Sequence, residues 1–255
     1  MSTAPYWTYF VGPFVGSFLA FWLARLYDAN RRFKERLAAG NLALLVLKSQ
    51  YNDFILFRRG FREDCKRVPL TGTEPVWMLL RPNFIVYGTY EFDYEGISFL
   101  FEGGAFTKAF EAIEELHVKH RDLVQMDKQR TETASTTQRL VAEASLAQNF
   151  DQMPAEMIIG PAFVAELDML CVGLARRAER GESAYLNAFN MLREELRDNI
   201  KKTWHYRLGY MYRCRHDATV EQYLVQLKPR LTKGFNLDEL PALPANLQSR
   251  LDGLA

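Results

Sequence analysis

The beginning of the chain lacks charge. No Asp, Glu, Lys or Arg occurs before Arg25, and the stretch from Tyr6 to Leu23 is mostly apolar and aromatic. An apolar helix of about 20 residues is long enough to span the hydrocarbon core of a bilayer. We therefore expect a transmembrane anchor over residues 1–27, with its span at residues 6–24.

The chain also has few cysteines and little net charge. Its three cysteines (Cys65, Cys171 and Cys214) are odd in number and widely spaced, which does not indicate a disulfide framework. The net charge of +1 gives no general argument for nucleic-acid binding. Any basic surface must therefore be local.

Common catalytic motifs are missing as well. The sequence contains no GxxxxGK, GxSxG or HExxH. His117 and His120 are spaced to lie close together on a helix, and Asp122 is near, but a metal site needs further ligands and a second shell. We interpret His120, on an apolar helix face, as a hydrogen-bonded packing residue. We predict no enzyme, no catalytic or metal-binding residue, no cofactor and no small-molecule substrate.

Basic residues follow the apolar run instead of preceding it, which favours an uncleaved anchor over a signal peptide. Positive residues favour the cytoplasmic side of a membrane, so we expect a single pass with the N-terminus outside and the body in the cytoplasm. The juxtamembrane basic residues are Arg25, Arg31, Arg32, Lys34 and Arg36.

Small residues recur every fourth position within the span, at Gly12, Gly16, Ala20 and Ala24. This spacing places them on one stripe of a helix, where they allow a second helix to approach closely. The pattern predicts self-association through the span.

The rest of the chain predicts a mainly α fold: a cytoplasmic helical bundle with a small β element. We expect a juxtamembrane helix over 28–68, a loop with short strands over 69–103, a bundle body over 104–228 and an extended tail over 229–255 that ends in a helical turn. Within the body, helices are predicted at 106–129, 138–148, 161–181 and 182–203, with a loop at Thr131–Thr137 and a strand at 204–214. The juxtamembrane helix has an apolar seam at heptad-like spacing: Leu37, Gly40, Leu44, Leu47, Tyr51 and Phe54.

One basic stretch is interleaved with aromatic residues. Cations can follow phosphates while aromatic rings stack on bases, and the same mixture suits anionic lipid headgroups. An edge strand with buried aromatics and solvated arginines is the simpler interpretation. The candidate contact residues are Lys201, Lys202, Trp204, Arg207, Tyr210, Tyr212, Arg213 and Arg215.

The order of these features resembles a class of bacterial inner-membrane proteins that includes membrane effectors of retron-type antiphage operons. The segments that carry the resemblance are AGNLALLVLKSQYNDF, GISFLFEGG, HVKHRDLV and ELDMLCVGLARRAERG. The resemblance implies a toxic effector that a nucleoprotein partner holds silent and that depolarises the membrane when released. It carries over no catalytic residues.

Three functions stay open on these grounds, and a membrane-tethered enzyme ranks last because the sequence shows no combination of nucleophile, base and orienting group. The first is an antiphage effector that oligomerises through its span and disrupts the inner membrane. The alternative is a non-toxic anchored scaffold or receptor whose helical body binds a protein or nucleic-acid partner. The expected partners are the lipid bilayer, further copies of the chain and a protein or nucleoprotein regulator.

Overall fold

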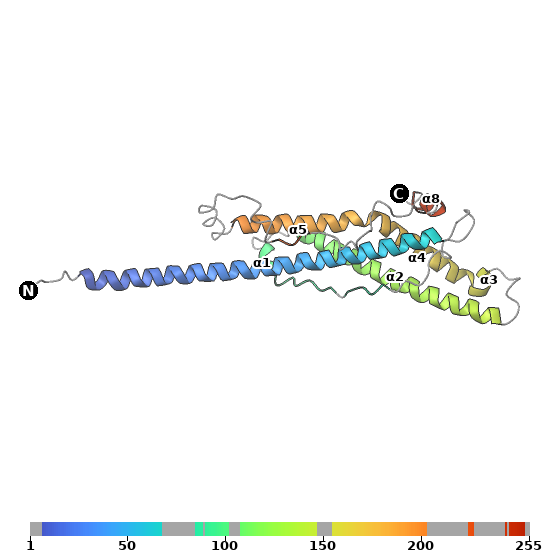
Figure 1. Cartoon of the computed structure of the whole chain (residues 1–255), viewed down its shortest axis with the longest axis horizontal. Helices are drawn as coiled ribbons and strands as arrows, with labels where there is room; N and C mark the ends of the chain where they lie inside the picture. Colours follow the sequence, from blue (N-terminus) through green and yellow to red (C-terminus); the bar gives the residue numbers. More distant parts are fainter. Residues whose placement is uncertain are drawn as a thin grey trace, which may run out of the picture. The chain divides into compact units, whose positions relative to one another are not determined.

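The computed structural model describes residues 7–67, 85–88, 90–101, 108–146, 155–202, 224–226, 243 and 245–252. These residues are mainly helical, as predicted (Figure 1). The elements are α1 (Trp7–Arg67), η2 (Ser98–Phe101), α2 (Lys108–Leu146), α3 (Ala155–Ile159), α4 (Pro161–Arg180), α5 (Glu182–Lys202) and α8 (Ala245–Asp252).

The chain divides into two compact units built from non-contiguous segments. The first unit comprises Met1–Leu45, Phe92–Thr107 and Leu192–Gln226, and the second comprises Val46–Glu91, Lys108–Met191 and Leu227–Ala255. Helices α1 and α5 each contribute residues to both units.

The core of the second unit forms where helices α1, α2, α4 and α5 bury residues at helical spacing. A stripe of apolar residues three or four positions apart stabilises a helix because burial removes that stripe from water. The predicted seam of α1 is confirmed from Gly40 onward, and α4 begins at Pro161 as expected. Phe163 continues the apolar spacing of α4 but is exposed. The fully or nearly fully buried residues include Phe54, Phe57, Phe61, Ile113, Leu116, Leu123, Leu170, Leu174, Tyr185 and Phe189.

The predicted loop at Thr131–Thr137 is wrong, because α2 continues through it to Leu146. The hydroxyl groups of Ser135, Thr136 and Thr137 donate to carbonyl oxygens four residues earlier, at 2.8, 3.0 and 2.9 Å. These bonds satisfy the hydroxyls within the helix. Thr133 and Thr137 are buried, so packing overrides the low helix propensity of this stretch.

The predicted small β element is wrong where the structure describes it. Residues 85–88 and 90–93 form no strand, and the ISFLF run contains the 3₁₀ helix η2. The Gly88 N–H donates to Asp53 Oδ2 at 3.2 Å, and the Tyr87 hydroxyl donates to Asp127 Oδ2 at 2.7 Å. Helix side chains therefore bind this extended segment in place of a neighbouring strand. The other strand predictions, at 76–80 and 204–214, lie outside the described residues.

In the first unit, Gly40 of α1 lies against Leu196 of α5. An added Cβ at Gly40 would clash with the Leu196 side chain, so the absence of a side chain allows the two helices to pack closely. Arg36 lies over the Phe99 ring at 5.5 Å, and the Val225 N–H donates to Asn41 Oδ1 at 3.1 Å. These contacts connect all three segments of this unit.

The N-terminal part of α1 has no such packing. Every residue from 11 to 24 is exposed, and Figure 1 draws this blue end as a bare helix. Within the described part of the chain, none of the helices has both the length and the apolarity required to cross a membrane. The predicted span at 6–24 is thus not found as a membrane-crossing helix.

Replacing Gly40 by valine should destabilise the protein by about 1–3 kcal/mol, because branched methyl groups would overpack the contact with Leu196. Gly16→Val on the same helix is the matched control, since nothing lies within 4 Å of its Cβ position. Urea unfolding followed by circular dichroism measures both. Equal unfolding free energies for the two variants would contradict the close packing at Gly40.

Candidate functional site

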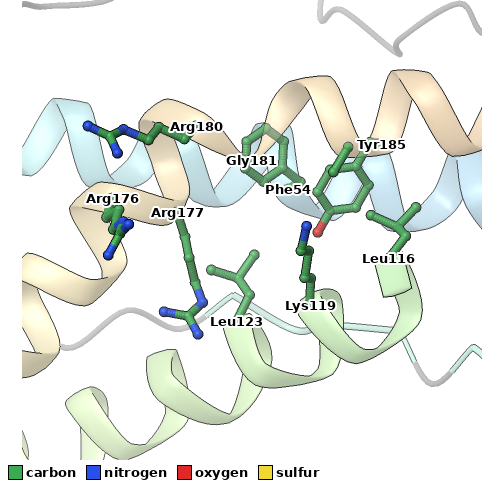
Figure 2. Close-up of a pocket in the computed structure, with 10 residues that line it drawn as sticks. Phe54, Leu116, Lys119, Leu123, Arg176, Arg177, Arg180, Gly181 and Tyr185 are labelled. Carbon is green, nitrogen blue, oxygen red and sulfur yellow. The ribbon is translucent and has the colours of Figure 1, made fainter. Parts of the chain in front are cut away.

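A cavity of about 450 Å³ opens between the helices of the second unit (Figure 2). This volume is within the usual range of small-molecule sites, roughly 300–1,000 Å³. The lining residues are Phe54 of α1; Leu116, Lys119 and Leu123 of α2; Arg176, Arg177 and Arg180 of α4; Gly181; and Ala184 and Tyr185 of α5.

The floor of the cavity is apolar. Phe54, Leu116, Leu123 and Tyr185 are each buried, and the Phe54 and Tyr185 rings stack with their centroids 4.8 Å apart. Each of these residues belongs to the buried face of its own helix, so the packing of the core also forms this floor.

Apart from Gly181 and Ala184, the remaining lining residues are cationic. Arg177 and Arg180 lie in the last turn of α4, Arg176 directly precedes that turn, and Lys119 contributes from α2. Figure 2 shows Lys119 and Leu123 extending from α2, in green, and Arg177 extending from α4, in tan. Lys119 Nζ is 2.5 Å from Glu115 Oε1, but no carboxylate is among the lining residues.

The acidic residues nearest in sequence to these arginines are bound to α1. Glu179 forms an ion pair with Arg62, and Glu182 Oε2 lies 2.6 Å from Arg58 Nη1. The Tyr51 hydroxyl donates to Glu182 Oε1 at 2.9 Å. Burial, with Glu182 nearby, raises the pKa of Tyr51, so its hydroxyl keeps the proton that it donates.

His120 lies behind the floor of the cavity and is buried. Its Nδ1 is 3.0 Å from the Tyr185 hydroxyl, which confirms the predicted role as a hydrogen-bonded packing residue. Burial, helped by the nearby His117, lowers the pKa of His120 to about 4. His117 itself lies 3.2 Å from Gln50 Nε2. Within the described part of the chain, no group of three or more His, Cys, Asp or Glu residues could hold a metal ion.

Other buried polar groups of this unit serve its structure. Asp127 pairs with the buried Arg130 at 2.9 Å. Asp53 accepts the Gly88 N–H and a bond from the Tyr90 hydroxyl, while burial raises its pKa. These groups bind one another and are absent from the lining of the cavity.

The structure does not bring the predicted site residues together at this cavity. Gly12, Gly16, Ala20 and Ala24 are exposed along α1. Lys201 and Lys202 end α5, whereas Trp204, Arg207, Tyr210, Tyr212, Arg213 and Arg215 lie outside the described residues.

The predicted juxtamembrane residues all lie on α1. Arg25 is 5.3 Å from the centroid of the Phe21 ring, and Arg31 Nε is 2.8 Å from Glu35 Oε1. Arg32 and Lys34 are exposed, and Arg36 lies over Phe99. Cations therefore follow directly after the apolar end of the helix.

Sequence reasoning missed the cavity. The signal available was the run ARRAER in α4, with basic residues at 176, 177 and 180. Such a run at the end of a helix usually reflects the favourable interaction of cations with the helix dipole. Comparison of the chain with protein-family models, curated proteins and solved structures finds no match.

The pKa of His120 predicts a specific acid sensitivity. Because the pKa is lowered in the folded state, the unfolded chain binds a proton first, so stability falls as the pH drops from about 6.5 to about 4. The loss is on the order of 3 kcal/mol. His120→Gln should remove most of this pH dependence, as measured by urea unfolding at several pH values.

His117→Gln is the matched control on the same helix face and should retain most of the slope, because burial is the larger cause of the lowered His120 pKa. An unchanged pH dependence in the His120 variant would contradict the assignment to the buried imidazole.

Proposed function

We propose that this protein is a bacterial membrane effector that attaches to the inner membrane through the N-terminal part of α1, self-associates there and disturbs the membrane when activated. The observation that carries the proposal is the exposed, uncharged segment at residues 11–24, here called the apolar segment. The membrane-disrupting step rests on the resemblance to antiphage effectors. A protein or nucleoprotein regulator belongs to the same proposal.

The apolar segment is unfavourable in water. Its large side chains are 46–75% exposed, and they belong to Val11, Phe14, Val15, Phe18, Leu19, Phe21, Trp22 and Leu23. Monomeric soluble proteins rarely expose a continuous apolar patch of more than a few hundred Å². Burial is worth about 25 cal/mol per Å², so an apolar surrounding would be strongly favoured.

The distribution of side chains around the segment supports lipid on one side and a second helix on the other. At about 100° per residue, Val11, Val15, Phe18 and Trp22 form a stripe of large side chains. The stripe of Gly12, Gly16, Ala20 and Ala24 is roughly opposite, and nothing lies within 4 Å of a Cβ built at either glycine. Large residues suit lipid tails, and small ones suit close helix packing.

The cations beyond the segment support the orientation. Arg25, Arg31, Arg32 and Lys34 are exposed within the first turns after it. Basic residues at this place interact with anionic lipid headgroups at about 1 kcal/mol each. The proposal therefore places the N-terminus outside and the helical body in the cytoplasm.

A non-toxic anchored receptor is the second candidate function. The cationic cavity in the second unit favours it, because membrane disruption by a helix assembly does not require a ligand site. Both candidates share the membrane attachment and differ in what the apolar segment does once inserted.

Membrane attachment predicts that Phe14→Asp/Phe18→Asp abolishes flotation of the purified protein with vesicles of phosphatidylglycerol and phosphatidylethanolamine. Two aspartates within the inserted helix would each cost several kcal/mol. Leu56→Asp is the control, since Leu56 is also exposed on α1 but lies outside the segment. Flotation of the double variant at the wild-type level would refute the attachment.

Self-association predicts that Gly12→Leu/Gly16→Leu blocks membrane depolarisation in bacteria that express the protein. Leucine retains membrane affinity but separates the helix backbones. Growth and membrane potential are followed beside wild type and Phe14→Leu/Phe18→Leu, which leaves the small stripe intact. Depolarisation that persists in the glycine variant would exclude the effector mechanism, whereas polarised cells with the wild type would favour the receptor.

A further inference from the structure

We propose that the cavity of the second unit binds an anionic amphiphile, with the anionic head at the arginines of α4 and the apolar body on the floor. The inference concerns a small ligand and is independent of the membrane attachment. It rests on the placement of charge, on the absence of polar acceptors in the lining and on the buried floor.

Within the described part of the chain, the arginines of α4 lack a local counter-charge. Among the described residues, Arg176, Arg177 and Arg180 form no ion pair. The intervening Glu179 is bound to Arg62, and Glu182 is bound to Arg58 and Tyr51.

Arg176 and Arg180 are four residues apart on one helix, where like charges repel. The helix dipole offsets this repulsion by about 0.3–1 kcal/mol per cation but does not neutralise the charges. An anion bound between the arginines would do so. Guanidinium groups match carboxylate and phosphate oxygens by paired hydrogen bonds.

The lining residues also limit the chemistry of the part of the ligand that follows the anionic head. Among the residues that the structure describes, the lining side chains are either cationic or from Phe, Leu, Ala and Tyr, with no Asp, Glu, Asn, Gln, Ser or Thr. The polar atom of Tyr185 is already within 3.0 Å of His120. A nucleobase or sugar would bring donors that find no side-chain acceptor here, and unpaired buried donors are costly.

A hydrocarbon body has no such requirement. Phe54, Leu116 and Leu123 are only 1–2% exposed, so they close the base of the cavity, and the apolar stems of the lining Lys and Arg side chains add to the surface that a ligand would touch. The cavity volume of about 450 Å³ is sufficient for part of an alkyl chain. The composition therefore selects one charged head and one apolar body.

The test is equilibrium binding of dodecyl phosphate to the full-length protein, below the concentration at which the probe forms micelles. Inorganic phosphate and dodecanol serve as the head-only and body-only probes. We expect dodecyl phosphate to bind at least about tenfold more tightly than either. Equal affinity for inorganic phosphate would overturn the amphiphile assignment.

The decisive variant is Arg177→Gln/Arg180→Gln, which should weaken dodecyl phosphate binding by about tenfold or more. If Arg177→Gln/Arg180→Gln unfolds more easily than wild type, the variant Arg176→Gln/Arg180→Gln is used instead, because it changes two exposed residues. Lys128→Gln/Arg139→Gln removes the same charge from exposed sites of α2 outside the cavity and should stay within about twofold of wild type.

Binding of the probe to the apolar segment of α1 would persist in all of these variants. Unchanged affinity in the arginine variants would therefore overturn the proposal. Vesicles of phosphatidic acid distinguish the source of the head group. If the vesicles compete with dodecyl phosphate for wild type and do not compete for the arginine variants, the ligand is a membrane lipid. If they do not compete for wild type, the ligand is a free amphiphile.

Discussion

Two arginines of α1 bind the turn between α4 and α5 through its carboxylates. Arg62 pairs with Glu179, and Arg58 pairs with Glu182, whose other oxygen accepts the Tyr51 hydroxyl. The side chains of both pairs are 11–31% exposed, so they are less screened than surface pairs. The rest of the second unit depends on this arrangement.

Gly181 lies in the same turn, and its lack of a side chain is part of the same arrangement. A Cβ at this position would lie 2.5 Å from the Arg177 carbonyl oxygen and 2.9 Å from Phe54 Cε2. The close approach of the turn to Phe54 places the Phe54 and Tyr185 rings together and directs the arginines of α4 to the open side. The same ion pairs that stabilise the fold thus withdraw the carboxylates from the cavity.

Much of the fold could be predicted from the sequence, because helices depend on local periodicity. The seam from Leu44 to Phe54 and the start of α4 at Pro161 follow from spacing and from the missing N–H of proline. The loop predicted at Thr131–Thr137 failed because low helix propensity was overridden by packing of Thr133 and Thr137. Likewise, the residues around Tyr87 favour a strand, but hydrogen bonds with residues distant in sequence bind this segment to the helices instead.

The cationic cavity could not be predicted, because its charge depends on which carboxylates form ion pairs elsewhere in the fold. In sequence, Glu179 and Glu182 lie next to the arginines as ready counter-charges, and only the fold shows that α1 binds both. The apolar segment is the opposite case, since its lack of charge is visible without a structure. The structure adds that every residue of the segment is exposed.

The binding of Tyr87 and Gly88 to helix side chains also affects aggregation. An extended aromatic and β-branched segment with free backbone groups is a template for pairing with other chains. Here Asp53 occupies the Gly88 N–H, and Asp127 and Asp53 hold the hydroxyls of Tyr87 and Tyr90. An unbound segment of this kind could start intermolecular β-structure. The two aspartates hold it on the helices and thereby restrain it.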